Sequence, residues 1–507
     1  MSKSKTPSYV LTLKLNLNKR DEDILTKRFE IARNLYNACL SQLLKRHDNL
    51  IQSKAYRILT AKINKVNQKI YKDSKNKPLP DLKEQQALLY KEMKELYRQF
   101  GLSEYQTHDY VKLMQHHFKK SIDSNTAQKI ASEAWGAINK LLTDNQTKKV
   151  HFKKFGELMS VEGKTNTAGI RYKNNQLQWL GLNMSVIAGK NDRYAQVALL
   201  DKVKYCRISR KWVKDNYKYY LQLILEGIPP VKEKHVLGEG RVGLDIGTQT
   251  IGIVGSNDVK LIELAPNVVN IDKEIRRLNR HLDRSRRATN PENFNIDGTV
   301  KRGIKLQWVK SKKYLRIQGL RRHLYRKQAD LRSLSHNILA NHILSLGNEV
   351  YVEEMNFKAL QKRSKKTEKN DKGNFKRKKR FGKSLAKKAP AKLLTILDNK
   401  LKWQEKRLRK ISTRDVKASQ YNHLNHQYQK KKLSERWNAL IYMGQEIKIQ
   451  RDLYSAFLIM NVDKTLTSVN QELCTQTFDK FLTLHDEEIL RLRNNAKKNI
   501  SSMGIAS

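Results

Sequence analysis

Cysteine is scarce in this chain: only Cys39, Cys206 and Cys474 occur among 507 residues, and no two of them form a C-x-x-C pair. A disulfide framework and a zinc site built from cysteines are therefore both excluded. No apolar run is long enough to span a bilayer, so no transmembrane helix is expected. The N-terminal MSKSKTPSYVLTLKLNL alternates apolar and polar residues, which predicts a strand and not a signal peptide.

Acidic residues are few compared with basic ones. The 49 Asp and Glu stand against 102 Lys and Arg, which gives a formal net charge of +53. A chain with this imbalance repels itself in its compact state unless a polyanion neutralises it. Nucleic acid is the polyanion we expect, and because the basic residues are spread over most of the sequence, we expect the contact to be extensive.

The chain is too long for one hydrophobic core, so we expect two to four domains. Residues 8–15 predict a strand, and an apolar stripe at helical spacing follows: Leu25, Phe29, Ala32, Tyr36, Cys39 and Leu43. Further helices are predicted over residues 54–73, 81–99 and 124–145. The pattern between 148 and 228 is that of strands, with a hairpin formed by KVKYCRI and YKYYLQLILEG. IPPVKEKHVLGEG predicts a linker, after which a third unit begins at Arg241.

Two later segments, 272–284 and 305–345, predict helices that are dense in arginine. Such a helix face is often only solvated, but the guanidinium fork suits bidentate contact with phosphate. We therefore assign a nucleic-acid-binding role to arginines of these helices and of the basic stretch 361–388, which is expected to be a loop. They are Arg276, Arg277, Arg280, Arg321, Arg322, Arg326, Arg377 and Arg380.

A single carboxylate, Asp245, interrupts the apolar stretch VGLDIGTQTIGIVG at residues 242–255. Two strands joined by a tight turn would place Asp245 near the end of the first strand, facing a cleft. Actin-like ATPases use a similar turn for a nucleotide phosphate, ribonuclease-H-like nucleases use such an Asp for a metal ion, and an Asp can also cap a turn. The chain has only 22 glycines and no second glycine-rich phosphate loop, which favours the nuclease.

A two-metal nuclease needs further carboxylates on separate elements, so that their oxygens converge on ions about 4 Å apart. NEVYVEEMNFKAL predicts a short strand, 350–352, that ends in Glu353; the alternative is that this residue and Glu354 are solvent-exposed. IKIQRDLYSAFLIMNV predicts a helix with Asp452 in its first turn and small or apolar residues on the packing side. Asp245, Glu353 and Asp452 together predict a metal-dependent site that cleaves phosphodiesters.

These motifs resemble those of the TnpB family, the transposon-encoded RNA-guided DNA endonucleases that are relatives of the compact Cas12 effectors. The segments that carry the resemblance are GLDIGTQTIGIV, VYVEEMNFKAL, ASQ at 418–420 and QRDLYSAFLIMN. The family's third motif reads D-R-D-x-N-A-A-x-N-I, of which this chain keeps Arg451, Asp452, Ala456 and Ile459. The resemblance spans nearly the whole chain, although its specific motifs occupy only the C-terminal half.

The resemblance implies an α+β multidomain fold. An N-terminal wedge-type β-barrel carries a helical recognition insert, and an RNase-H-like (RuvC) α/β domain carries a target-nucleic-acid-binding insert. The implied parts are the barrel at 1–20 and 148–232, the helical insert at 21–147, the nuclease domain at 241–415 and 445–462, its insert at 416–444, and an unassigned C-terminal tail at 463–507.

The resemblance also implies an activity, namely hydrolysis of target DNA at one RuvC-like site. Asp245, Glu353 and Asp452 would hold two Mg²⁺ ions, with Asp245 bridging both and Mn²⁺ as a possible substitute. The implied partners are a structured guide RNA and double-stranded target DNA that is recognised beside a short flanking motif. No membrane partner is implied, and the expected location is the prokaryotic cytoplasm, in association with the nucleoid. Whether one or two copies assemble on the RNA is left open.

The chain departs from the family in the zinc ribbon that normally separates the second and third motifs. The cysteine positions are taken by Asn422, Asn425, Leu440 and Met443, so no structural zinc is expected. His423 and His426 have a metal-like spacing but lack a second pair of ligands. We expect this degenerate ribbon to fold without metal, and the residues expected to stabilise it are Trp437, Leu440, Ile441 and Met443.

Two other functions stay open. A nuclease-deficient, RNA-guided DNA-binding repressor would lack one or more of the three carboxylates; all three are present, and only the missing ribbon favours this function. A DNA-only RuvC-like transposase or resolvase would not need the long basic helical and strand segments that precede residue 241.

Overall fold

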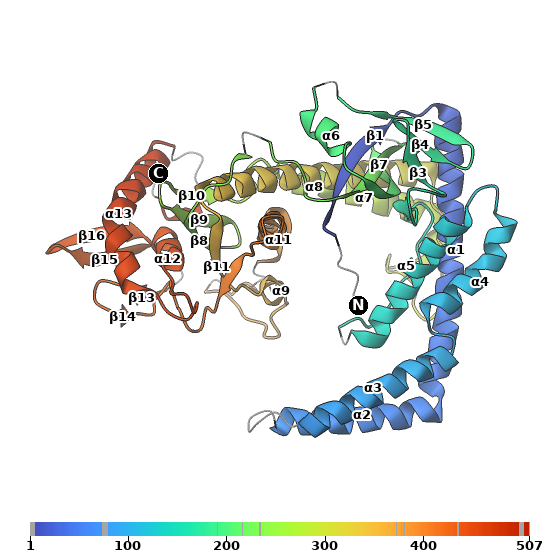
Figure 1. The fold of residues 1–507 in the computed structure, drawn as a ribbon, viewed down its shortest axis with the longest axis horizontal. Helices are drawn as coiled ribbons and strands as arrows, with labels where there is room; N and C mark the ends of the chain where they lie inside the picture. Colours follow the sequence, from blue (N-terminus) through green and yellow to red (C-terminus); the bar gives the residue numbers. More distant parts are fainter. Residues whose placement is uncertain are drawn as a thin grey trace. The chain divides into compact units, whose positions relative to one another are not determined.

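The computed structural model describes residues 6–73, 80–144, 146–189, 191–214, 216–232, 235–371, 373–376, 378, 381–432, 435–495 and 501–505. It divides into two compact units, Met1–Pro230 and Val231–Ser507, whose elements are labelled in Figure 1. Arg377 and Arg380, two of the arginines with a predicted nucleic-acid role, lie outside the described residues. None of the described helices combines the length and the apolar character needed to cross a bilayer.

The first unit begins with strand β1 and continues as helices. Their bounds are β1 (Ser8–Leu15), α1 (Lys19–Gln52), α2 (Lys54–Asp73), α3 (Pro80–Gln99), α4 (Glu104–His117) and α5 (Ser124–Thr143). The predicted strand and the helices corresponding to α1, α2, α3 and α5 are confirmed, whereas α4 was not predicted. Every residue of the predicted apolar stripe is buried on α1, because one face of this helix packs into the core of the unit.

The strands of the first unit form a seven-stranded sheet in the order β2-β6-β7-β1-β5-β4-β3. The bounds that complete it are β2 (Ser160–Glu162), β3 (Arg171–Lys173), β4 (Gln176–Trp179), β5 (Leu182–Ile187), β6 (Val203–Val213) and β7 (Asn216–Glu226), with helix α6 (Arg193–Ala198) before β6. The predicted hairpin is confirmed as β6 and β7. The sheet curls, so that β3 comes close to β6. Strand β1 alternates exposed and buried residues because only one of its faces meets the core.

The second unit is built on a five-stranded sheet in the order β10-β9-β8-β11-β12. Its strands are β8 (Arg241–Ile246), β9 (Thr250–Gly255), β10 (Val259–Glu263), β11 (Glu349–Glu353) and β12 (Arg409–Ile411). The first three strands are antiparallel, and β11 and β12 both run parallel to β8. The chain as described is therefore a mixed α and β protein in both units.

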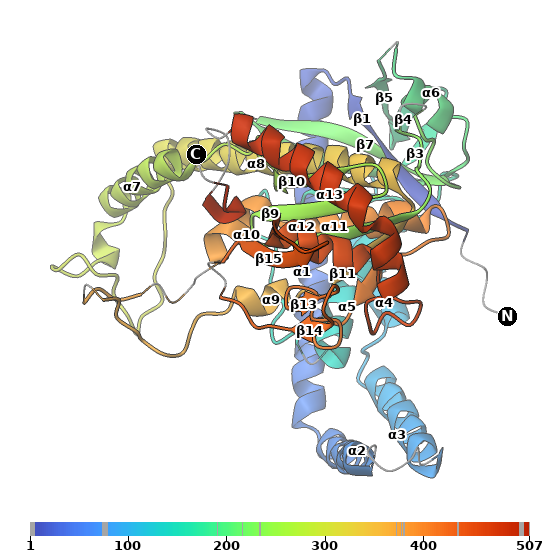
Figure 2. The ribbon, with the colours of Figure 1, turned by 90° about the vertical axis from the view of Figure 1, so that its left-hand side faces the viewer.

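Helices cover both faces of this sheet. One face, with Val242, Leu244 and Val352, packs against α8 (Lys312–Leu346) and α11 (Pro390–Lys402). The other face packs against α12 (Arg451–Met460) and α13 (Gln471–Asn494). Figure 2 shows α13 lying across β10. Helix α13 lies entirely within the segment that the sequence left unassigned, and its buried side chains share the core of α12.

Two glycines let α12 lie directly on the sheet. A Cβ on Gly243 of β8 would be 2.0 Å from the carbonyl oxygen of Ala456, and one on Gly252 of β9 would be 2.6 Å from that of Asp452. No side chain fits into such a gap. The glycines of the VGLDIGTQTIGIVG stretch thus set the close approach of helix and sheet.

The remaining elements of the second unit lie outside this sandwich. They are α7 (Asp272–Thr289), η2 (Pro291–Asn293), α9 (Phe357–Leu360), α10 (Gly382–Lys388), β13 (Tyr421–Asn422), β14 (Gln427–Tyr428), β15 (Trp437–Tyr442), β16 (Gln445–Gln450) and η4 (Ser501–Met503). The loop predicted over 361–388 is wrong at its end, because residues 382–388 form α10 and the Lys388 ammonium is bound 2.6 Å from Glu263.

The segment predicted to be a degenerate ribbon, 416–444, contains the hairpin β13–β14 and the strand β15, which forms a second hairpin with β16 beyond the predicted boundary. Of the residues expected to stabilise it, Leu440 is buried and Trp437 is half-buried, but Ile441 and Met443 are exposed. The expectation was wrong for Ile441 because side chains alternate along β15 and only one face of the hairpin meets the core. It was wrong for Met443 because this residue lies in the turn of the hairpin, with a positive φ of 48°.

Candidate functional site

Asp245 and Glu353 lie side by side on the central strands of the second sheet. Val352 of β11 pairs with Leu244 of β8 in parallel register, and the next residue on each strand is one of the two carboxylates. Neighbouring strands are about 4.8 Å apart, so the two side chains share one face near the carboxyl ends of their strands. A parallel pair was needed for this, because it brings equivalent strand ends to the same edge.

Asp452 faces the same side of the sheet from helix α12. Asp245 is paired across the ladder with Gly252, and the backbone of Asp452 lies directly over this glycine. Gln450 caps the helix by accepting a hydrogen bond from the backbone N–H of Leu453, which places Asp452 in the first turn. The structure thus brings together the three carboxylates that the sequence singled out.

The charges of Glu353 and Asp452 act on Asp245. Burial first, and then the negative charges of Asp452 and Glu353, raise the pKa of Asp245 well above its usual value. The side chain keeps some contact with solvent although protein surrounds it densely. Burial likewise raises the pKa of Glu353, while a hydrogen bond from the backbone of Ala418 acts in the opposite direction. The Ala418 backbone belongs to the ASQ segment, which is thereby next to the site.

Two arginines surround Asp452. Its Oδ1 lies 3.1 Å from Nη2 of Arg451, and its Oδ2 lies 3.5 Å from Nη1 of Arg436. Both guanidinium groups lower the pKa of Asp245, although less than the carboxylates raise it. Arg451 was noticed in the sequence only as part of a motif, and Arg436 was missed because it precedes β15 and meets Asp452 only through the fold.

Carboxylate oxygens are the ligands that Mg²⁺ prefers, and the negative charges of Asp452 and Glu353 beside Asp245 suit a divalent cation. The donor chemistry therefore fits the ion that the sequence implies. Among the described residues, however, no three His, Cys, Asp or Glu side chains already lie close enough to form a metal site. The geometry agrees with this, because Asp452 is engaged by its two arginines.

A cavity of about 580 Å³ opens beside Glu353, between β11 and α11. Lys402, Arg407 and Lys410 contribute positive charge to its lining, and Asp398 forms ion pairs with the first two of them, at 3.0 and 3.2 Å. The sequence did not point to this group, because its members come from a helix end, a loop and an edge strand.

Residue His423, considered for its metal-like spacing, is a core residue. Its Nδ1 lies 2.7 Å from the hydroxyl of Tyr454, and its ring packs against Phe457 and Phe478. Burial, with a smaller effect from His426, lowers its pKa to about 4. The structure thus gives His423 a packing role on α12, the helix that also carries Asp452.

The six described arginines that were predicted to bind nucleic acid lie on α7 and α8, which pack together through Leu278, Leu282 and Ile317. Arg276, Arg277 and Arg280 are exposed, and the three on α8 are half-buried. Arg321 donates to Asn279 and Arg326 is paired with Asp330, so these two arginines already have partners within the protein. The sequence located these residues correctly on helices.

Comparison with known proteins places the chain in no family, since no family model and no curated protein matches it. It is similar to a chain of a cryo-EM structure of the Cas12f1–sgRNA–target DNA complex, with a TM-score of 0.39, 10% identity, and coverage of 89% of this chain and 98% of that one. It is also similar to a chain of a CRISPR–Cas12f ternary complex, with a TM-score of 0.24, 13% identity, and coverage of 88% and 86%. Resemblance at this level assigns neither a fold nor a function.

Proposed function

We propose that this chain is an RNA-guided DNA endonuclease that hydrolyses target DNA at Asp245, Glu353 and Asp452. The observation that carries the proposal is the convergence of these three carboxylates, from two parallel strand ends and one helix, on a single face of the sheet. Burial and two neighbouring carboxylates raise the pKa of Asp245, and burial raises the pKa of Glu353. Buried acidic groups whose pKa is shifted in this way are characteristic of functional sites.

The order of the strands supports an RNase-H-like (RuvC) domain. In chain order the sheet runs third, second, first, fourth, fifth, with the first three strands antiparallel and the last two parallel to the first. This is the arrangement of RNase-H-like nucleases, in which the first strand and the fourth carry acidic residues. The proposal extends to the barrel, helical insert and ribbon insert at the boundaries predicted from the sequence.

In the proposed reaction Asp245, Glu353 and Asp452 would hold Mg²⁺, or Mn²⁺ in its place. When bound, the metal supplies an activated water and stabilises the leaving oxygen of the phosphodiester. The chain itself contributes orientation: the register of β8 and β11 fixes two carboxylates relative to each other, and the Gln450 cap fixes the third. Arg436 and Arg451 add positive charge where a phosphate would arrive.

A guide RNA and target DNA account for the charge of the chain. The three carboxylates of the site do not explain a formal net charge of +53, whereas the phosphates of a long nucleic acid would balance it. The exposed arginines of α7 provide part of this positive charge on an ordered surface. The arginines of the two helices are proposed to contact phosphates of the nucleic acids. No zinc enters the proposal, and the proposed location is the prokaryotic cytoplasm at the nucleoid.

The test begins with purification of the chain from its host and sequencing of the RNA that accompanies it. One abundant RNA species is expected, with a constant structured part and a variable segment. The sequence of the variable segment then defines the target that is placed in a plasmid. That plasmid should be cut with Mg²⁺ by the wild type and left intact by Asp245→Asn, which must still bind the RNA. A random RNA mixture would overturn RNA guidance and favour a DNA-only nuclease.

A second candidate, the nuclease-deficient RNA-guided binder, is favoured by one observation. Asp452 is held by Arg436 and Arg451, and the three carboxylates form no ready-made metal site among the described residues. In the same plasmid assay this candidate predicts tight, guide-dependent binding without cleavage by the wild type.

A further inference from the structure

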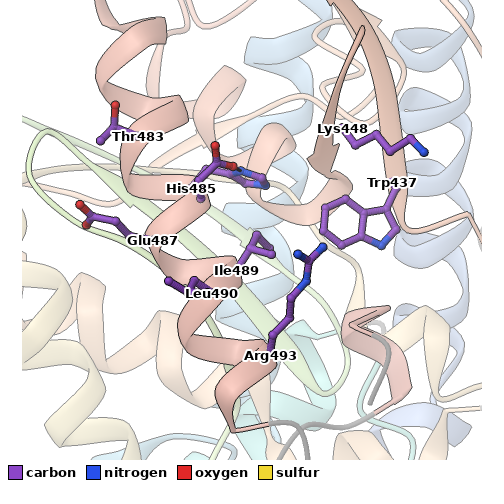
Figure 3. Close-up of a pocket in the computed structure, with 9 residues that line it drawn as sticks. Trp437, Lys448, Thr483, His485, Glu487, Ile489, Leu490 and Arg493 are labelled. Atoms are coloured by element: carbon purple, nitrogen blue, oxygen red, sulfur yellow. Dashed lines mark hydrogen bonds and ion pairs between the residues drawn. The ribbon is translucent and has the colours of Figure 1, made fainter.

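A cavity that the proposed reaction does not use lies between hairpin β15–β16 and helix α13, and its volume is about 880 Å³ (Figure 3). The hairpin contributes Trp437 and Lys448, and the helix contributes Ile489, Leu490 and Arg493. One aromatic ring, two aliphatic side chains and two cations on facing walls suit a ligand that has both a flat apolar part and a negative part.

The indole of Trp437 is held in a defined orientation. Its Nε1–H donates to the carbonyl oxygen of Gly504 at 2.9 Å, and its ring meets that of His485 edge to face, with centroids 6.4 Å apart. The ring is half-buried, so part of it stays available inside the cavity. A fixed aromatic surface of this kind binds a flat ring with little loss of side-chain entropy.

The two cations flank this ring. Figure 3 shows Lys448 above the indole and Arg493 beside it, from opposite walls of the cavity. Among the described residues neither cation forms an ion pair with a carboxylate, because Asp486 is bound to Nδ1 of His485 and Glu487 points away from the indole. Positive charge next to an aromatic platform is the combination that binds a base and its phosphate.

The cavity is close to the carboxylates along the chain. Trp437 pairs with Gln450 across the hairpin, and Asp452 follows two residues later. A cross-strand step of about 5 Å and two residues of at most about 7 Å place the two backbones within roughly 12 Å of each other. The residues that flank the hairpin, Arg436 and Arg451, are the two that hold Asp452.

We propose that this cavity binds one unpaired nucleotide of the DNA strand that the carboxylates cut, with its base against Trp437 and its phosphate between Lys448 and Arg493. The identity of the ligand rests on the proposed function. The role expected for the pocket is to hold a single strand in register with the site, because a base must leave its duplex before it can enter. Figure 3 shows the side chains that would make these contacts.

The test uses the full chain and a single-stranded oligonucleotide with one 5-iodouracil, in EDTA so that the DNA stays intact. After irradiation, the crosslinked peptide is identified by mass spectrometry. The main crosslink is expected on the peptide that contains Trp437, and Trp437→Leu should reduce it about tenfold, the scale of one lost base stack. Trp437→Phe should keep most of it, which separates loss of the ring from a misfolded hairpin.

The variants Lys448→Ala and Arg493→Ala should weaken the same crosslink and make it less sensitive to salt, since each removes one phosphate contact. Tyr428→Leu is the matched control: this aromatic is 53% exposed on the neighbouring hairpin and should leave the crosslink unchanged. Crosslinks spread over many peptides, with no change in Trp437→Leu, would overturn the proposal. If millimolar thymidine monophosphate displaced the oligonucleotide, the ligand of the cavity would be a free nucleotide and not a DNA strand, which would also overturn the proposal.

The crosslinking test and the cleavage test can fail independently of each other. A Trp437 crosslink in a chain whose wild type never cuts DNA would refute the proposed cleavage and leave a strand-binding pocket. Cleavage that depends on Asp245, without a crosslink at Trp437, would refute the pocket alone.

Discussion

Gly252 lies directly beneath Asp452: a Cβ on this glycine would be 2.6 Å from the carbonyl oxygen of the aspartate. Because Gly252 is also the ladder partner of Asp245, the same glycine connects the acidic strand with the acidic helix. The site therefore depends on a residue that has no side chain.

Substitution of Gly243 or Gly252 by Ala should move α12 away from the sheet. The added methyl would meet backbone atoms, which cannot rotate aside, so we expect a loss of about 3 kcal/mol in the free energy of unfolding. Chemical denaturation of the purified chain measures this. Gly136→Ala is the matched control, since this glycine lies within helix α5 with no heavy atom within 4 Å of the new Cβ, and the change should be neutral or slightly stabilising. Equal stability of all three variants would contradict the close packing.

Asp245→Asn should stabilise the metal-free protein at pH 8. The pKa of Asp245 is raised in the folded state, so the folded chain binds its proton more tightly than the unfolded chain does. Stability should then decrease as the pH rises from the unfolded pKa, near 4, through the raised value. Thermal unfolding in EDTA across this range should show a gain for Asp245→Asn that is present at pH 8 and absent near pH 4. A variant that is less stable than the wild type at pH 8 would contradict this.

Divalent metal should relieve the same repulsion. Millimolar Mg²⁺ or Mn²⁺ is expected to raise the Tm of the wild type at pH 8, because a ligand that binds only the folded state stabilises it by mass action. Asp245→Asn and Glu353→Gln should reduce this shift, and K⁺ at matched ionic strength controls for screening. The readout is independent of DNA cleavage, and an identical shift in both variants would place metal binding elsewhere.

The buried His423 should make the ribbon hairpins sensitive to acid. Its pKa is lowered to about 4 in the fold, so protonation between pH 6.5 and 4 favours the unfolded state by up to about 3 kcal/mol. Stability measured over this range should increase with pH. His423→Phe should flatten that dependence, whereas His116→Phe, at an exposed position on α4, should leave it unchanged. A pH dependence that persists in His423→Phe would assign it to other groups.

Glu488 on α13 should be essential for the stability of the second unit. Its carboxylate is buried, accepts from the backbone N–H of Leu261 at 2.8 Å and is paired with Arg491 at 2.6 Å. Glu488→Ala leaves these partners unsatisfied and should cost about 3–5 kcal/mol. The exposed neighbour Glu487 provides the control, because Glu487→Ala should change the free energy of unfolding by less than about 0.5 kcal/mol. Similar values for the two variants would contradict a stabilising role of the buried Glu488 carboxylate.

The sequence by itself determined the elements that carry the site. Alternation over 8–15, helical spacing from Leu25 to Leu43, and the acidic residue at the end of each apolar strand all rest on local periodicity, which is visible in neighbouring residues. For the same reason the three carboxylates and the arginine-rich helices could be located without coordinates, although the sequence could not test their roles.

The tertiary structure alone decided which distant segments of the chain contact one another. Arg436 contacts Asp452, the C-terminal helix α13 enters the core of α12, and the backbone N–H of Gln450 donates to Nε2 of His485. Strand order and packing join these segments, which no local pattern relates. The exposure of Ile441 and Met443 likewise depended on which face of a hairpin met the core. Local periodicity is a property of adjacent residues, whereas these contacts depend on chain crossings and burial, which only the folded chain defines.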